Sequence, residues 1–111
     1  MEYKIQELTT VEEMLDQIEI MQFLYPKLSS TQYKSYLLEM VPHSYTQIAV
    51  FEKNNCVGIT GCWFGTKLWT GKYLEIDNFI VSPSHRSKGI GKLLTSFVEK
   101  KAFVLKIEML F

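Results

Sequence analysis

The first part of the chain reads as a short strand followed by an amphipathic helix. Tyr3 and Ile5 alternate with polar neighbours, which predicts an opening strand of about six residues. Thr10 and Glu13 have the spacing of a capping box, and Pro26 forbids the helix to continue. The apolar stripe between them consists of Val11, Met14, Leu15, Ile18 and Met21. This spacing predicts one helix with a single buried face.

A second helix is expected after Ser29 and Ser30, either of which suits an N-cap, and before Pro42, which stops the pattern. Its stripe consists of Tyr33, Tyr36, Leu37, Met40 and Val41. We interpret both helical stripes as core positions that pack against a sheet rather than as a ligand-binding surface.

From Tyr45 onward the apolar period changes from that of a helix to that of strands. Residues 46–51 and 56–64 are rich in strand formers and are separated by the turn Asn54-Asn55, which predicts a β-hairpin. A third strand is expected from about Tyr73 to Val81. These three strands read as neighbours in an antiparallel arrangement.

The clearest helix is predicted over residues 89–102. Its apolar stripe consists of Ile90, Leu93, Leu94, Phe97 and Val98. Residues 103–111 are either a final strand or an extension of this helix, because no Gly or Asn separates them from it. The resulting order of one strand, two helices, three strands, a helix and a possible last strand is an α+β plan in three layers.

Length and charge narrow the classes of protein. A chain of 111 residues is expected to form a single domain over residues 1–111. Twelve basic and twelve acidic residues cancel, so a broad basic surface for nucleic acid or anionic lipid is not expected. No apolar run is long enough to span a membrane and no leader is recognisable, which favours a cytoplasmic protein. Cys56 and Cys62 are too far apart along one strand for a disulfide, so we expect two buried thiols.

The segment Tyr73 to Leu94 joins a strand, a basic glycine-containing loop and a helix. Free backbone N–H groups at a helix start, together with the helix dipole, favour an anion such as a pyrophosphate. A Walker A loop is excluded because Arg86 occupies its first glycine position and Leu93 follows Lys92. A dinucleotide fingerprint is excluded because Leu94 stands at its third small position.

The hexapeptide Arg86-Ser87-Lys88-Gly89-Ile90-Gly91 matches the pattern Arg/Gln-x-x-Gly-x-Gly/Ala, between an apolar strand and an amphipathic helix. In this context the chain resembles the GNAT superfamily of acetyl-CoA-dependent N-acetyltransferases. The resemblance extends from Tyr3 to about Leu110 and implies a GNAT-like fold with a mixed, mostly antiparallel sheet. It also implies acetyl-CoA as co-substrate, with no metal, and transfer of the acetyl group to a primary amine in a ternary complex.

The resemblance assigns roles to the residues around this loop. The amides of the loop would hold the coenzyme pyrophosphate, and the end of the preceding strand would run beside the pantetheine arm, its main-chain N–H groups polarising the thioester oxygen. The residues so implied for coenzyme binding are Phe79, Ile80, Val81, Arg86, Ser87, Lys88, Gly89, Ile90, Gly91 and Lys92. His85 is interpreted as a loop residue rather than a catalytic base.

Two acids on the preceding strand are the candidates for proton transfer. Strict alternation puts Glu75, Asp77, Phe79 and Val81 on one face, and Leu74, Ile76, Asn78 and Ile80 on the other. A carboxylate on this strand can attract an ammonium group and accept its proton, often through water. Either Glu75 or Asp77 could be this base. The resemblance places Glu75 where many members carry the base, and Asp77 where other members carry an acid that binds or orients the acceptor.

The chain stops at Phe111, before the last helix and two strands that the resemblance leads us to expect, so no general acid can be assigned. A truncated chain, a homodimer that completes the sheet edge, and a degenerate member are the alternatives, and we favour an oligomer of a truncated chain. The acceptor is a small-molecule or protein amine, and the acids favour a cationic one. The alternative functions are a CoA-binding or protein-interaction module without turnover, and a plain turn without ligand.

Overall fold

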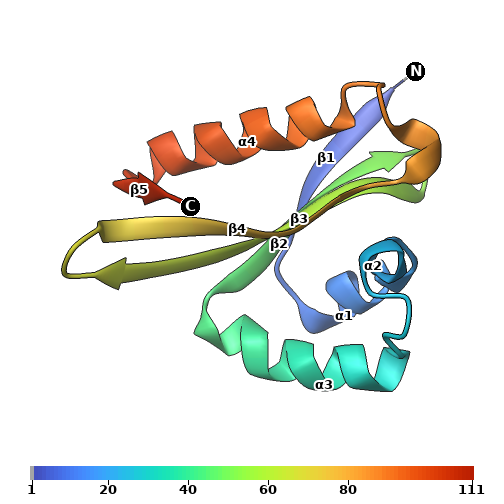
Figure 1. Cartoon of the computed structure of the whole chain (residues 1–111), viewed down its shortest axis with the longest axis horizontal. Coiled ribbons are helices and arrows are strands. Elements are labelled where there is room, and N and C mark those ends of the chain that lie inside the picture. The colour runs from blue at the N-terminus through green and yellow to red at the C-terminus, as the bar shows by residue number, and fades with distance from the viewer. Residues whose placement is uncertain (1) are drawn as a thin grey trace.

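The computed structural model describes residues 2–111 and consists of a sheet between two helical layers (Figure 1). Within these residues the sheet has five strands in the order β1-β2-β3-β4-β5. The strands are β1 (Tyr3–Leu8), β2 (Tyr45–Glu52), β3 (Asn55–Lys67), β4 (Gly71–Val81) and β5 (Met109–Leu110). The helices are α1 (Val11–Leu15), α2 (Ile18–Leu24), α3 (Ser30–Met40) and α4 (Ile90–Val104), with 3-10 turns η1 (Val41–His43) and η2 (Pro83–His85). Met1, the first residue of the expected domain, lies outside the described residues.

The predicted α+β plan and mixed sheet are confirmed. Neighbouring strands are antiparallel except β4 and β5, which are parallel. Helix α4 covers one face of the sheet and α1, α2 and α3 cover the other, while the long β3–β4 hairpin extends beyond both helical layers (Figure 1). No helix within residues 2–111 is long and apolar enough to cross a membrane.

Each face of the sheet has its own hydrophobic core. On the α1–α3 face the buried residues are Leu8, Met14, Ile20, Met21, Tyr33, Leu37, Tyr45, Ala49, Ile59 and Ile80. On the α4 face they are Ile48, Val50, Val57, Cys62, Leu74, Ile90, Leu94 and Val98. Alternating strand residues send their side chains to opposite faces of the sheet, so each face offers an apolar surface. The predicted apolar stripes of the helices pack on these two surfaces and complete the two cores.

The first predicted helix is two helices. The capping box is present, with the Glu13 N–H bonded to the Thr10 hydroxyl and the Glu13 carboxylate accepting from the Thr10 N–H. After Leu15 the chain turns, and the Gln17 N–H bonds to Met14 O three residues back instead of continuing the α-helical ladder. The apolar residues predicted for this helix still pack in one core. The break therefore changes the direction of α2 while its apolar face stays buried.

Strict alternation along β4 is wrong beyond Asp77. Two residues, Asn78 and Phe79, lie opposite the single residue Thr60, and Asn78 has the left-handed conformation with φ 54°. This β-bulge shifts the side-chain parity by one residue. The α1–α3 face of β4 consequently carries Glu75, Asp77, Asn78 and Ile80, while Leu74, Ile76, Phe79 and Val81 face α4.

The C-terminal segment contains both of the alternatives that the sequence left open. Helix α4 ends in a Schellman motif: Ile107 N–H bonds to Ala102 O at 2.9 Å and Lys106 N–H to Phe103 O at 3.2 Å. Lys106 takes the left-handed position, φ 58°, which glycine usually fills. The chain then forms the short strand β5 beside Tyr73 and Leu74 of β4.

Candidate functional site

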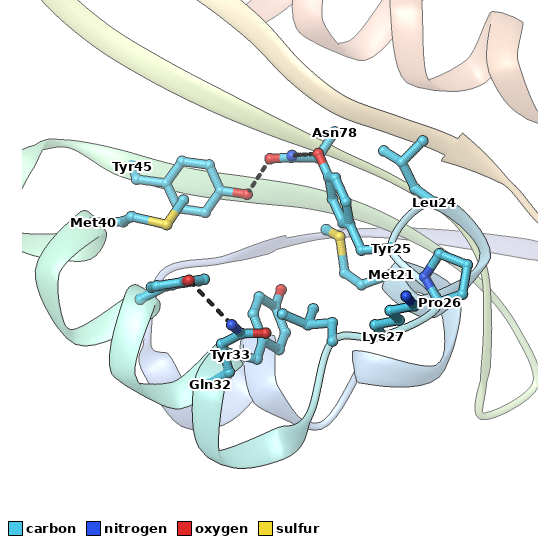
Figure 2. A pocket seen from close by; sticks show the side chains of 12 residues that line it. Met21, Leu24, Tyr25, Pro26, Lys27, Gln32, Tyr33, Met40, Tyr45 and Asn78 are labelled. Carbon is cyan, nitrogen blue, oxygen red and sulfur yellow. Dashed lines mark hydrogen bonds between the residues drawn. The ribbon is translucent and has the colours of Figure 1, made fainter.

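A cavity of about 610 Å³ opens between α2, α3 and the β4 bulge (Figure 2). It is lined by Met21, Leu24, Tyr25, Pro26, Lys27, Leu28, Gln32, Tyr33, Tyr36, Met40, Tyr45 and Asn78. Its walls are mainly apolar and aromatic, with a few polar groups, which is the usual character of a small-molecule site.

Asn78 connects the cavity wall to the sheet. Its side-chain amide donates to the Tyr25 hydroxyl at 2.7 Å and accepts a hydrogen bond from the Tyr45 hydroxyl at 2.9 Å (Figure 2). The bulge itself is held by Asp77, whose Oδ1 accepts from the Asn78 N–H at 2.8 Å and whose carbonyl accepts from the Thr60 hydroxyl at 3.3 Å. The bulge therefore directs Asn78 into the cavity instead of toward α4.

Two of the cavity's tyrosines belong to a buried polar network. Gln47 Nε2 donates to the hydroxyls of Tyr33 at 2.9 Å and Tyr45 at 3.1 Å. Burial raises the pKa of Tyr33 and raises that of Tyr45 much further, the bond from Gln47 opposing the shift in each. Both phenols consequently remain protonated at neutral pH and serve the cavity as neutral hydrogen-bonding groups.

The two predicted acids lie on the α1–α3 face of β4 but in different settings. Glu75 is exposed and pairs across the sheet with Trp63. Asp77 is half-buried, and its Oδ2 accepts from Trp63 Nε1 at 3.1 Å while its Oδ1 is used by the bulge. Trp63 in turn packs on Tyr45 with ring centroids 4.8 Å apart. This aromatic pair thus links Asp77 to the wall of the cavity.

The predicted anion-binding loop begins after η2 and leads into α4. Gly89 is the N-cap of α4 with φ 82°, and Ser87 is also left-handed with φ 68°. No atom of the described residues lies within 4 Å of where a Gly89 side chain would start, so the space beside the helix start is open. The first intrahelical bond runs from Leu93 N–H to Gly89 O. The earlier amides of α4 have no acceptor within the helix and can serve an external anion.

The side chains predicted for the coenzyme do not all reach the surface. Those of Arg86, Ser87, Lys88 and Lys92 are exposed, as is Gly89. Ile80 and Ile90 are buried in opposite cores, so only their backbone can meet a ligand. Phe79 is 40% exposed and its ring lies 3.6 Å from where a Gly91 side chain would start. The bulge therefore places Phe79 at the loop and its neighbour Asn78 in the cavity.

His85 anchors the loop to the sheet. Its Nε2 lies 3.0 Å from Glu52 Oε1 at the end of β2, and its Nδ1 lies 3.1 Å from the Ser84 hydroxyl. The hydrogen bond with His85 is the main cause that lowers the pKa of Glu52. This geometry agrees with the interpretation of His85 as a loop residue, and gives it a bracing contact that the sequence did not predict.

Both cysteines are free thiols on β3, Cys62 buried and Cys56 half-buried. Burial raises the pKa of Cys56 to about 12 and of Cys62 to about 11. Neither is therefore an activated nucleophile at neutral pH. Within the part of the chain that the structure describes, no three His, Cys, Asp or Glu residues gather in a way that could hold a metal ion.

Sequence reasoning missed the cavity. Tyr33 and Met40 lie in or against the core as predicted and also line the cavity. Tyr36, another predicted core position, lines the cavity and is 48% exposed. The signal available in the sequence was Asn78, because Asn is unusual inside an apolar strand and tolerates the left-handed conformation of a bulge. The cluster of tyrosines, in contrast, comes together only through the tertiary fold.

Comparison with known proteins identifies a family for this architecture. The model described as "Acetyltransferase (GNAT) family" matches residues 12–111. No curated protein sequence is similar enough to count as a match.

Solved structures share the fold. A GNAT family acetyltransferase from Staphylococcus aureus superposes with a TM-score of 0.83 at 20% identity, covering 99% of this chain and 84% of that one. Glucosamine-6-phosphate N-acetyltransferase from Arabidopsis thaliana gives 0.79 at 15% identity, covering 100% and 81%. An aminoglycoside N-acetyltransferase in complex with CoA gives 0.80 at 13% identity, covering 98% and 74%. At these identities the likeness shows a common fold.

Proposed function

Because this chain belongs to the acetyltransferase (GNAT) family, we propose that it transfers an acetyl group from acetyl-CoA to a primary amine by direct attack in a ternary complex. The observation that carries the proposal is the bulge of β4. It turns Phe79 toward the start of α4 and Asn78 into the cavity, so that one short stretch of strand borders both a loop suited to an anion and a pocket suited to a small molecule.

In this proposal the loop before α4 binds the coenzyme. The main-chain amides from Ser87 to Lys92 hold the pyrophosphate at the helix start, where the helix dipole favours negative charge. Arg86 and Lys88 add positive charge from exposed positions, and Gly89 leaves open space for a phosphate oxygen to approach. The bond from His85 to Glu52 braces the loop against the end of β2.

The end of β4 lies beside the pantetheine arm in this proposal. Phe79 and Val81 contribute from the α4 face, whereas Ile80 contributes only its backbone, because its side chain is buried in the opposite core. A bulge interrupts the ladder to β3 and leaves an extra residue unpaired. The main-chain N–H groups of this stretch then polarise the thioester oxygen as the tetrahedral centre develops.

The proton from the amine goes to Glu75 through water, and Asp77 orients the site. Glu75 is exposed and close in the sheet to Trp63. Asp77 already accepts hydrogen bonds at both carboxylate oxygens, from Trp63 and from its own strand, which suits a positioning residue better than a base. After attack, the tetrahedral centre expels the CoA thiolate and the amide product forms.

Calorimetric titration of acetyl-CoA tests the proposal. The double variant Arg86→Ala, Lys88→Ala should weaken binding by about tenfold or more, since it removes two cations from a pyrophosphate site. The matched control is Lys34→Ala, Lys100→Ala, two exposed lysines on α3 and α4 away from the loop, which should bind as the wild type does. Absence of binding to folded wild-type protein would overturn the function.

We also keep a homodimer as a proposal. Met109, Leu110 and Phe111 beside β4, and Phe103 and Val104 at the end of α4, are large apolar side chains that are exposed in the single chain. A second copy covering this strip would remove that surface from water. A solution mass equal to one chain over the working concentration range would contradict it.

A further inference from the structure

The cavity carries an unexpected balance of charge. Among the 12 described residues that line it there is no aspartate or glutamate, and Lys27 is the one basic residue (Figure 2). Glu75 and Asp77, the two acids of β4 that would favour a cationic acceptor, lie elsewhere on the same face and are not among these lining residues. A ligand with several ammonium groups would find no counter-ion here and would be repelled by Lys27.

The polar groups of the cavity are phenols held by amides. Tyr25 accepts from the amide of Asn78, Tyr33 from that of Gln47, and Tyr36 from that of Gln32 at 3.2 Å. A phenol that accepts one hydrogen bond still has its own proton to donate. The Tyr33 hydroxyl is buried against Gln47, whereas the hydroxyls of Tyr25 and Tyr36 lie in exposed hydrogen bonds. Two hydroxyls and the Lys27 ammonium group therefore offer donors to a ligand, and the matching ligand groups are carbonyl or carboxylate oxygens.

The remaining walls are apolar. Met21 and Met40 bring flexible thioether side chains that adapt to irregular shapes, and Leu24, Pro26 and Leu28 complete the surface together with the tyrosine rings. A flat or branched hydrocarbon group that binds here moves from water into contact with apolar side chains. This burial of apolar surface is the main favourable contribution to the binding free energy at such a site.

We propose that the acetyl acceptor is a primary amine carried on an aromatic or branched aliphatic body with a carbonyl or carboxylate oxygen close to the amine, the chemistry of an apolar α-amino acid or its amide. The apolar body occupies the cavity between α2 and α3, the oxygen faces Lys27 and the phenols, and the amine faces Asn78 at the β4 bulge. This inference rests on the proposed function for the identity of the reaction, but its binding preference can be measured without turnover.

Direct binding of single amines to the protein without acetyl-CoA is the first test. L-Phenylalanine and phenylethylamine should bind at least about tenfold more tightly than spermidine, because only the first two can bury a ring. Methyl NMR signals of Met21 and Met40 should shift on binding, while those of Met14, in the core, and Met109, in β5, stay in place. Equal or tighter binding of spermidine would overturn the inference and leave acetyl transfer as a function intact.

Two variants and one control test how charge determines which amine binds. Leu24→Glu introduces a carboxylate at a cavity residue that is 45% exposed, and Leu38→Glu introduces one at a residue of α3 that is 56% exposed and does not line the cavity. Leu24→Glu should raise spermidine affinity about fivefold and weaken phenylethylamine, while Leu38→Glu changes neither. Lys27→Gln should weaken L-phenylalanine several-fold and leave phenylethylamine unaffected, because only the former has a carboxylate.

Turnover with acetyl-CoA then tests the two proposals against each other. Release of CoA with L-phenylalanine or its amide at a kcat/KM at least about tenfold above that with spermidine supports both. Turnover only with polyamines overturns the acceptor class. Acetyl-CoA binding that fails while the amine preference is found would overturn the acetyltransferase function and keep the cavity as an apolar amine site.

Discussion

The hydroxyl of Tyr45 and the side chain of Asn78 are joined by a 2.9 Å hydrogen bond that runs from β2 across the sheet to the bulge of β4. Tyr45 is fully buried and packs on Trp63, so its position is fixed by the core. The same bond, together with the bond to Tyr25, fixes the side chain of Asn78. The shape of the cavity wall is therefore set by the core of the α1–α3 face.

Replacement of Asn78 should show whether the bulge depends on its backbone conformation as well as on its hydrogen bonds. Asn78→Ala removes the bonds to Tyr45 and Tyr25 and leaves a β-carbon at φ 54°, and we expect a loss of about 2–3 kcal/mol in the free energy of unfolding. Asn78→Gly removes the same bonds without the strain and should lose about 1 kcal/mol less. Equal losses in urea titrations of the two variants would contradict a strained bulge.

The pattern of the sequence predicts the order of elements because the helical stripes and strand alternation are direct consequences of burying one face. It fails at residues where the backbone leaves the regular conformations. Strict alternation through Asn78 put Phe79 on the wrong face, and the split between α1 and α2 has no Gly or Pro to mark it. Lys106 ends α4 in the left-handed conformation that glycine normally signals.

The loop around Gly89 was predictable because its chemistry is local: a strand, a turn and a helix start are contiguous in the sequence. The cavity was not, because Tyr25, Tyr33, Tyr45 and Asn78 come from four different elements or connections. Their meeting depends on how α2 and α3 pack on the sheet. A bulge changes which strand residues face the helices. A periodic sequence pattern does not reveal such a one-residue shift, because the shift exchanges the two faces of the strand beyond it.

Gly89 should tolerate asparagine for folding but not for coenzyme binding. Asn accepts the left-handed conformation better than other residues with a side chain, so Gly89→Asn should change unfolding free energy by less than about 1 kcal/mol. Its side chain would occupy the open space beside the start of α4, and acetyl-CoA affinity should fall by about tenfold or more. Ser44→Asn, at another exposed left-handed position, is the matched control. Unchanged affinity in Gly89→Asn would move the pyrophosphate away from this loop.

Substitutions of Glu75 and Asp77 on β4 should show that Glu75 is catalytic and that Asp77 is a positioning residue. Glu75→Gln should lower kcat by about 100-fold with unchanged acetyl-CoA affinity, and should change stability by less than about 0.5 kcal/mol because the side chain is exposed. Asp77→Asn should cost about 1–2 kcal/mol of stability, since Asn offers one acceptor oxygen where Asp77 uses two.

The pH dependence of kcat distinguishes these roles. A general base gives a rise of rate with pH that is lost in Glu75→Gln and kept in Asp77→Asn. Glu99→Gln, an exposed acid on α4, serves as the control and should leave both rate and stability unchanged. If Asp77→Asn alone removed the rise, the assignment of the two residues would be reversed.

Lys106→Gly should stabilise the protein, because it relieves a β-carbon at φ 58° while keeping the two backbone bonds of the Schellman motif. We expect a gain of about 1 kcal/mol in thermal or urea unfolding. Lys100→Gly, at an exposed position inside α4, should lose about 1 kcal/mol instead, because glycine is unfavourable in a helix interior. A loss in both variants would mean that the end of α4 is not held as described.

The hydrogen bond between His85 and Glu52 should make the free energy of unfolding depend on pH in the acidic range. The bond from His85 lowers the pKa of Glu52 in the folded chain below its ordinary value of 4.5. A lowered folded pKa means that the contribution to stability is present above about pH 4.5 and is lost as the pH falls through the folded pKa. The melting temperature should therefore drop on that side, and less so in Glu52→Gln, which cannot ionise.

The same variant tests whether this pair braces the coenzyme loop. At about pH 7 the carboxylate is ionised, so Glu52→Gln removes the anion that holds His85 and should weaken acetyl-CoA binding about two- to threefold through a looser loop. Glu13 is the comparison, because its pKa is also lowered, mainly by the Thr9 N–H, but it lies at the start of α1, far along the chain from the loop. Glu13→Gln should reduce the loss of stability at acidic pH and leave acetyl-CoA affinity unchanged. An equal loss of affinity in both variants would assign the effect to global stability rather than to the contact between His85 and Glu52.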